Sequence, residues 1–271
     1  MKLTDEEYKH LADYMYKKFG INLKGKKTLI EARLASIIRD RQFQSFSQYI
    51  ETLTRDISGV EDSIIVSKLT TNYTYFMREQ GHYNFSKRKA LPELCPRIKD
   101  KDLRVWSSAC SSGEEPYSIA MMLDEYFNNN HSDEKWDKVV LASDISDNVL
   151  RTATQGVYSK GSMTALSNGE VSKYFTPAGT DTFKVTPYLR SQVAFKKINL
   201  MDPFSFKKPF HIIFCRNVMI YFDNQTKEKL INKFYDVLVP GGYLYIGLSE
   251  SIINLKTKFT YVEPAIYKKE K

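Results

Sequence analysis

The chain has 271 residues, of which 42% are hydrophobic and 27% are charged, and its formal net charge is +8. This is the balance of a globular protein with one large domain or two, and it excludes a repeat or low-complexity protein. No apolar run approaches the ~20 residues of a membrane span, and the first ten residues are too acidic for a signal peptide. Three widely spaced cysteines (Cys95, Cys110 and Cys215) suggest reduced thiols and a cytoplasmic location. The modest positive charge permits an acidic partner but does not establish nucleic-acid binding.

The first 70 residues or so are predicted to be entirely helical. Thr4 and Glu7 form a capping box, apolar residues then recur at helical spacing, and Gly20 ends this helix. Further helices are expected at residues 27–41, 47–53 and 60–69.

The helix at 27–41 combines an apolar face with a basic one. The basic residues on its outer face and just before it are Lys24, Lys26, Lys27, Arg33, Arg39 and Arg41, against only Glu31 and Asp40. Such a face suits either an acidic partner or simple solvation.

The pattern changes after about residue 95, where short β-rich runs alternate with helical segments. The runs are 103–107, 138–143, 193–199, 211–215 and 243–248, and the helical segments are 116–127, 147–154 and 225–238. Alternation of this kind predicts parallel strands with helices on both faces of the sheet.

Two segments depart from this alternation. Residues 243–248 and 259–267 have no helical pattern between them and predict an antiparallel hairpin at the end of the chain. Residues 168–192 contain Asn168-Gly169 and an alternating run, and they predict a small antiparallel β insertion rather than another helix.

Acidic residues follow the first two predicted strands. Glu115 lies in the first turn of the helix after the small-residue loop 107–113, and Asp144 ends the next strand. Taken singly, Glu114 and Glu115 also suit the positive end of a helix dipole, and Asp144 also suits a turn or a helix cap. Because they follow successive strands in this order, Glu115 and Asp144 together favour an adenosine-type ligand. A carboxylate at the end of the second strand can accept hydrogen bonds from both ribose hydroxyls.

The loop also narrows the choice of ligand. It lacks the G-x-G-x-x-G pattern, and acids stand where a pyrophosphate would be repelled. S-adenosylmethionine (SAM) carries adenosine without phosphate, and its sulfonium and amino groups are cations. The combination of small residues and carboxylates therefore predicts a SAM site. The four histidines show no ligand spacing, so no metal is expected.

Six stretches of the sequence match the motifs of one family. They are TTNYTYFMRE (70–79), RVWSSACSSGEEPYSIA (104–120), ASDIS (142–146), INL (198–200), FCRNVMIYF (214–222) and VPGGYLYIGLSES (239–251). Through them the chain resembles the chemotaxis receptor methyltransferases of the CheR family, essentially from end to end. Two positions depart from the family pattern: Met77 replaces a usual aromatic residue, and Leu248 replaces the histidine of many members.

The resemblance implies an α/β fold with a SAM-dependent methyltransferase Rossmann-like sheet. The sheet would be mostly parallel with a C-terminal antiparallel hairpin, beside an N-terminal all-helical domain and the small antiparallel β insertion at about 168–192. Residues 1–75 would recognise the receptor, and 76–95 would form a linker or helix that closes over the cofactor. Residues 96–271 would form the SAM-binding catalytic domain.

The resemblance also implies the reaction and the partner. The protein would transfer a methyl group from SAM to glutamate side chains of chemotaxis receptors, giving methyl esters and S-adenosylhomocysteine (SAH). The partner would be the receptor's cytoplasmic domain, met by a monomeric enzyme without metal, nucleic acid or membrane insertion. Arg33 and Arg39, on the basic helix, are predicted to dock this acidic substrate.

Site residues follow from the matching positions. Arg78 and Tyr221 would face the reacting carboxylate, and Arg78 would also contact the cofactor. The other expected cofactor contacts are Asn72, Thr74, Glu115, Asp144, Asn199, Leu200, Arg216 and Asn217.

Two alternatives remain at this stage. The first is a SAM-dependent methyltransferase of nucleic acid, which the basic charge permits. Base N-methylation in related sheets uses an Asn/Asp-Pro-Pro-aromatic turn after the fourth strand, where this chain has Arg216-Asn217-Val218. The second is a non-catalytic signalling protein that binds SAM as a ligand.

Overall fold

Four helices form the N-terminal part of the chain. They are α1 (Asp5–Phe19), α2 (Lys27–Asp40), α3 (Phe46–Arg55) and α4 (Val60–Leu69), as predicted, in a computed structural model that describes residues 2–270. Helix α1 starts at the predicted capping box and ends at Gly20, whose φ is +69°. A Cβ at Gly20 would also lie 2.5 Å from the Met201 sulfur, so both backbone and packing require glycine here.

The second part of the chain begins with a helical run after an irregular segment. Residues 70–80 contain no α-helix or strand, and α5 (Gly81–Phe85), η1 (Ser86–Ala90), α6 (Leu91–Leu94) and η2 (Cys95–Arg97) follow one another directly. Aromatic contacts, including Tyr83 with Phe214 and Phe85 with Tyr243, pack this run against the sheet. The helices therefore position residues 70–80 next to the sheet.

The main sheet has the predicted parallel strands. They are β1 (Val105–Ser107), β2 (Val140–Asp144), β6 (Val193–Lys197), β7 (Phe210–Cys215) and β8 (Leu238–Ile246), in a sheet ordered β6-β2-β1-β7-β8-β10-β9. The chain moves outward from β1 to β2 and β6, and then returns to the other side of β1 with β7. The switch point between β1 and β7 is where such sheets bind ligands.

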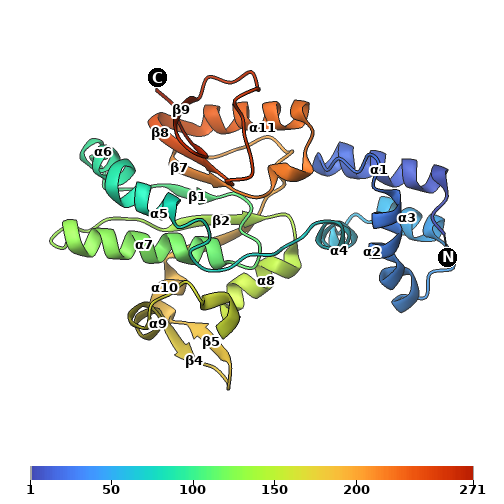
Figure 1. Ribbon diagram of the computed structural model, residues 1–271, viewed down its shortest axis with the longest axis horizontal. Helices are drawn as coiled ribbons and strands as arrows, with labels where there is room; N and C mark the ends of the chain where they lie inside the picture. Colours follow the sequence, from blue (N-terminus) through green and yellow to red (C-terminus); the bar gives the residue numbers. More distant parts are fainter. Residues whose placement is uncertain (1, 271) are drawn as a thin grey trace.

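Helices cover both faces of this sheet (Figure 1). They are α7 (Glu114–Asn130), α8 (Asp147–Gln155) and α11 (Asn224–Val237). Successive strand residues point to opposite faces, so Trp106 belongs to the apolar cluster that also contains α11, while Val105 belongs to the cluster with α7. The apolar residues of α1–α4 belong to the Trp106 cluster. The helical part is therefore joined to one face of the sheet by a continuous core.

The predicted antiparallel pairing at the end of the chain is confirmed, with one correction: residues 259–267, expected to form one strand, contribute to two. Strands β9 (Thr260–Glu263) and β10 (Ile266–Lys268) pair antiparallel, and β10 also pairs antiparallel with β8. The last strand thus lies inside the sheet, and β9 forms its edge.

The small antiparallel sheet is also present, with two corrections. It is ordered β3-β5-β4, from β3 (Val157–Ser159), β4 (Phe175–Pro177) and β5 (Thr182–Val185), so it begins before residue 168. The range expected to lack helices contains α9 (Asn168–Tyr174) and α10 (Pro187–Ser191), and η3 (Lys160–Met163) precedes it. Ser167 and Glu170 form a capping box that starts α9, a signal that outweighs the turn tendency of Asn168-Gly169.

The helical part meets the sheet near the carboxyl ends of its strands. Ile21 and Phe222 form an isolated antiparallel bridge, and the Asn22 amide donates to the Tyr221 carbonyl at 2.8 Å. On α4, the Ser63 hydroxyl accepts from the Asp147 amide at 2.7 Å. In Figure 1 the α1–α4 part lies to one side of the sheet and the small β3-β5-β4 sheet lies below it. Across residues 2–270, no helix has the length and apolar character needed to cross a membrane.

Candidate cofactor site

A cavity of about 420 Å³ lies at the carboxyl edge of the main sheet. This is within the usual range for a small-molecule site. Ten predicted site residues line it: Asn72, Thr74, Arg78, Glu115, Asp144, Asn199, Leu200, Arg216, Asn217 and Tyr221. The structure thus brings together every residue expected near the cofactor or the acceptor, from segments spread over 150 positions of sequence.

The loop between β1 and α7 forms the floor of the cavity. Its backbone is tied to neighbouring strands, since the Ser108 amide donates to Phe214 and the Cys110 amide donates to Ser143, both at 2.8 Å. Gly113 ends the loop with φ +101°, and a Cβ there would lie 2.8 Å from the Ala153 Cβ. The loop therefore requires glycine at this position, where it leads into α7.

Asp144 connects this loop to the end of β2. Its Oδ2 accepts from the Ser111 amide and its Oδ1 from the Ser146 amide, each at 3.0 Å. Burial raises the pKa of the Asp144 carboxyl above its ordinary value, although these amide bonds oppose the shift. An ionised carboxylate has about four acceptor positions, so two remain for ligand hydroxyls.

The two neighbouring acids of α7 have different environments. Glu115 lines the cavity, accepts from the Ser107 hydroxyl at 2.7 Å and pairs with Arg216 at 2.8 Å. Glu114 is 5% exposed, accepts from the Ser112 hydroxyl at 2.7 Å and does not line the cavity. Burial raises the pKa of the Glu114 carboxyl. Of the two acids, Glu115 is therefore the one available to a ligand.

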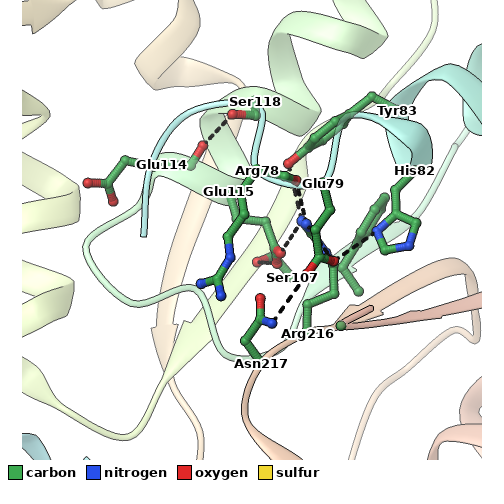
Figure 2. A network of polar contacts seen from close by, with 12 residues as sticks. Arg78, Glu79, His82, Tyr83, Ser107, Glu114, Glu115, Ser118, Arg216 and Asn217 are labelled. Atoms are coloured by element: carbon green, nitrogen blue, oxygen red, sulfur yellow. Dashed lines mark hydrogen bonds and ion pairs between the residues drawn. The ribbon is translucent and has the colours of Figure 1, made fainter. Parts of the chain in front are cut away.

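Arg216 is the centre of a buried polar cluster (Figure 2). Its side chain is 1% exposed, and it donates to the Glu79 carboxylate, the Glu115 carboxylate, the Tyr83 hydroxyl and the Arg78 carbonyl. These contacts use all five N–H groups of the guanidinium. In this arrangement Arg216 holds Glu115 in place, and a direct cofactor contact stays a prediction.

Two other predicted ligand contacts have their polar atoms bonded within the protein. The Tyr221 hydroxyl accepts from the Thr71 amide at 2.7 Å and donates to the Thr71 carbonyl at 3.2 Å. The Asn199 side-chain amide donates to the Lys18 carbonyl of α1 at 2.8 Å and accepts from the Met201 amide at 3.0 Å. Both residues thus connect the helical part to the sheet at the cavity.

Arg78 differs from Arg216 in its contacts. Its Nη1 donates to the Tyr73 carbonyl at 2.8 Å, the single hydrogen bond of its guanidinium within residues 2–270. Its side chain is partly exposed and lines the cavity. Arg78 is therefore the cavity guanidinium with donors left for a carboxylate.

The two predicted docking arginines lie outside this cavity and differ from each other. Arg33 donates to the carbonyls of Leu69 (2.8 Å) and Thr70 (3.3 Å), so it secures the end of α4. The Arg39 side chain is 77% exposed and contacts its neighbour Asp40. Arg39 is free to meet a partner, whereas Arg33 has a structural role that its position on the basic helix did not indicate.

Sequence reasoning missed an apolar wall of the cavity. Phe19, Ile21 and Val66, from the helical part, line the cavity together with Ile145 and Ile198 from the sheet. Phe19 belongs to the helical spacing of the first helix, and nothing in the sequence pattern indicated that Phe19, Ile21 or Val66 reaches the ligand site.

The cavity fits a cationic nucleoside such as SAM. The carboxylates of Glu115 and Asp144 and the partly exposed Arg78 line it, and the apolar wall offers a surface for an adenine ring. Within residues 2–270, no group of three or more His, Cys, Asp or Glu side chains is placed to hold a metal ion.

Comparison with known proteins identifies the family. A model described as "CheR methyltransferase, SAM binding domain" matches residues 72–267, and one described as "CheR methyltransferase, all-alpha domain" matches residues 6–70. The chain is 43% identical to a chemotaxis protein methyltransferase of Borreliella burgdorferi, over 99% of this chain and 96% of the relative. It is 32% identical to chemotaxis protein methyltransferase Cher2 of Pseudomonas putida (97% and 96% covered) and 33% identical to the chemotaxis protein methyltransferase of Salmonella typhimurium (98% and 91%). The resemblance found in the motifs is confirmed: the chain belongs to the CheR family of SAM-dependent methyltransferases.

Proposed function

We propose that this enzyme transfers the methyl group of SAM to glutamate carboxylates in the cytoplasmic domain of chemotaxis receptors, releasing SAH. The observation that supports the proposal most directly is that one cavity gathers the family's motif residues, among them Arg78, whose side chain is partly exposed. The relatives named as chemotaxis protein methyltransferases support the choice of receptor as substrate.

The proposed chemistry requires little proton transfer. SAM supplies a methyl group on a positively charged sulfur. A glutamate carboxylate, with an unperturbed pKa near ~4.3, is already a nucleophile at neutral pH. The protein then has to align the acceptor and exclude water. Arg78 orients the carboxylate by charge-assisted hydrogen bonds.

In this proposal the main role of Tyr221 is to position the segment that contains Thr71. Its hydroxyl is engaged by both backbone groups of Thr71, so it holds the segment that carries Arg78. A bond from Tyr221 to the acceptor would require one of these contacts to open.

In this proposal the helical part and residues 76–95 have different roles. The helical part recognises the receptor through the exposed basic residues of α2, and residues 76–95 close over the cofactor. The enzyme acts in the cytoplasm, because its substrate is the cytoplasmic domain of the receptor, and a monomer is the state that this proposal assumes.

The product should be a methyl ester. Incubation with methyl-labelled SAM and a receptor cytoplasmic fragment is expected to label the fragment, and mild alkali should release the label as methanol. Esters hydrolyse under these conditions, whereas N-methyl groups survive. Label that resists alkali would reject the glutamate acceptor, and label transferred to added nucleic acid would favour the alternative substrate class.

Charge reversal on α2 should raise the KM for the receptor. Lys26 and Arg39 are exposed, whereas Lys27 pairs with Asp5 and Arg41 pairs with Glu61. The double variant Lys26→Glu/Arg39→Glu should lose electrostatic attraction to an acidic receptor surface, most strongly at low salt, without a change in SAM affinity. The matched control is Lys99→Glu/Lys207→Glu, with the same charge change at exposed positions elsewhere. Equal receptor kinetics in the two variants would mean that the basic face is only solvated.

A further inference from the structure

Glu79 lies behind the cavity wall and joins three segments of the chain. It does not line the cavity, and its side chain is 13% exposed. Its Oε2 accepts from Arg216 Nη2 at 3.1 Å, and its Oε1 accepts from the Leu248 amide at 3.2 Å and from the Asn217 side chain at 3.4 Å. Glu79 therefore ties the segment before α5 to the loops after β7 and β8.

The backbone around Glu79 is held in an uncommon conformation. Met77 and Glu79 both have positive φ, +56° and +57°, and the Arg78 carbonyl accepts from Arg216. Such conformations cost free energy in residues other than glycine and persist where surrounding contacts impose them. The contacts to Arg216 hold this segment, which places Arg78 at the cavity and Glu79 behind it.

The cluster has an excess of negative charge. Two carboxylates, Glu79 and Glu115, pair with the single guanidinium of Arg216. Burial acts to raise the pKa of Glu79, but the Arg216 guanidinium and two further donors, the Leu248 amide and the Asn217 side chain, hold that pKa below its ordinary value. Burial lowers the pKa of the neighbouring His82 to about 4 and raises that of Tyr83 to about 12. Both neighbours are thus neutral near pH 7, and the cluster carries one net negative charge.

This charge distinguishes the two forms of the cofactor. SAM carries a sulfonium, an ammonium and a carboxylate group, with a net charge of +1, whereas SAH has lost the sulfonium charge and is neutral. We propose that Glu79, without touching the cofactor, increases the affinity for SAM relative to SAH by supplying the unpaired negative charge of the Arg216 cluster. The inference rests on SAM binding and is independent of the methyl acceptor.

The test is to measure both dissociation constants by calorimetry, without acceptor, in Glu79→Gln and Glu79→Asp. Removing one charge at roughly 10 Å in a medium of effective dielectric constant about 20 changes an affinity on the order of tenfold. Glu79→Gln should therefore weaken SAM binding about tenfold more than SAH binding. Glu79→Asp keeps the charge and should leave the ratio of the two constants close to that of the wild type.

Glu93→Gln is the matched control. Glu93 also pairs with a cation, Lys268, at 2.7 Å and accepts from the Tyr243 hydroxyl, but it does not line the cavity, and Tyr243 pairs with the start of β7, away from the carboxyl edge of the sheet. The same substitution there should leave the SAM-to-SAH ratio unchanged. Equal losses of both ligands in Glu79→Gln would overturn the proposal and leave Glu79 a purely structural residue. If Glu79→Gln does not fold, Glu79→Asn and Glu79→Asp make the same comparison with a shorter side chain: a ratio that differs about tenfold between them would support the proposal, and equal ratios would overturn it.

Discussion

Replacing Arg216 with methionine is expected to lower the free energy of unfolding by about 3–5 kcal/mol, the usual cost of removing one partner from a buried ion pair. The substitution leaves the carboxylates of Glu79 and Glu115, 13% and 12% exposed, without their shared guanidinium. It also removes the donor to the Arg78 carbonyl, which holds the segment before α5.

Urea unfolding, followed by circular dichroism, would measure the loss. Arg39→Met is the control, because the Arg39 side chain is 77% exposed and its replacement should change the free energy of unfolding by no more than about 0.5 kcal/mol. Adding Glu79→Gln to Arg216→Met should recover part of the stability, since one of the two unpaired charges disappears. An Arg216→Met protein as stable as the control would show that the cluster contributes little to folding.

Replacing Asp144 with alanine should weaken SAM binding by about 10²–10⁴-fold. Hydrogen bonds to a charged group contribute about 1.5–3 kcal/mol each, and the two free acceptor positions of Asp144 suit the two ribose hydroxyls. The variant also loses the acceptor of the Ser111 and Ser146 amides, so the floor of the cavity loosens.

The control for this variant is Asp147→Ala, three residues further on. The Asp147 side chain is 44% exposed, pairs with Lys197 at 2.5 Å and does not line the cavity, so its loss should leave SAM affinity nearly unchanged. The pH dependence gives a second measurement. Because burial raises the pKa of Asp144, its ionised form is lost as pH falls through that raised value, and SAM affinity of the wild type should decline there. Calorimetry that finds equal affinity in Asp144→Ala and the wild type would remove Asp144 from the cofactor site.

Most elements of the fold could be predicted because their signals are local. The capping box of Thr4 and Glu7 and the left-handed Gly20 set both ends of α1 within the helix itself. Parallel strands also place their carboxyl ends at one edge, so residues after successive strands could be expected to meet, as Glu115 and Asp144 do. In residues 168–192 two local signals competed: Asn168-Gly169 favours a turn, and Ser167 with Glu170 forms a capping box. The prediction followed the turn signal and was wrong, because the capping box starts α9.

The roles of individual polar groups could not be predicted in the same way. The partners of Arg33, Tyr221 and Arg216 lie 36, 150 and 137 residues away in sequence, at Leu69, Thr71 and Glu79. A guanidinium on a helix surface has the same sequence pattern whether it meets solvent, a receptor or a backbone carbonyl, and only the approach of the other segment selects among these.

The sequence by itself therefore determined most of the order of strands and helices along the chain and the edge where the ligand binds, and the resemblance to the CheR motifs indicated the residues that gather there. Periodicity, capping and strand polarity depend on neighbours along the chain. Only the tertiary structure decided that Phe19, Ile21 and Val66 close the cavity and that Glu79 stands behind it. Those contacts depend on how the helical part packs against the sheet through a shared apolar core, and burial between distant segments leaves no periodic signal in either one.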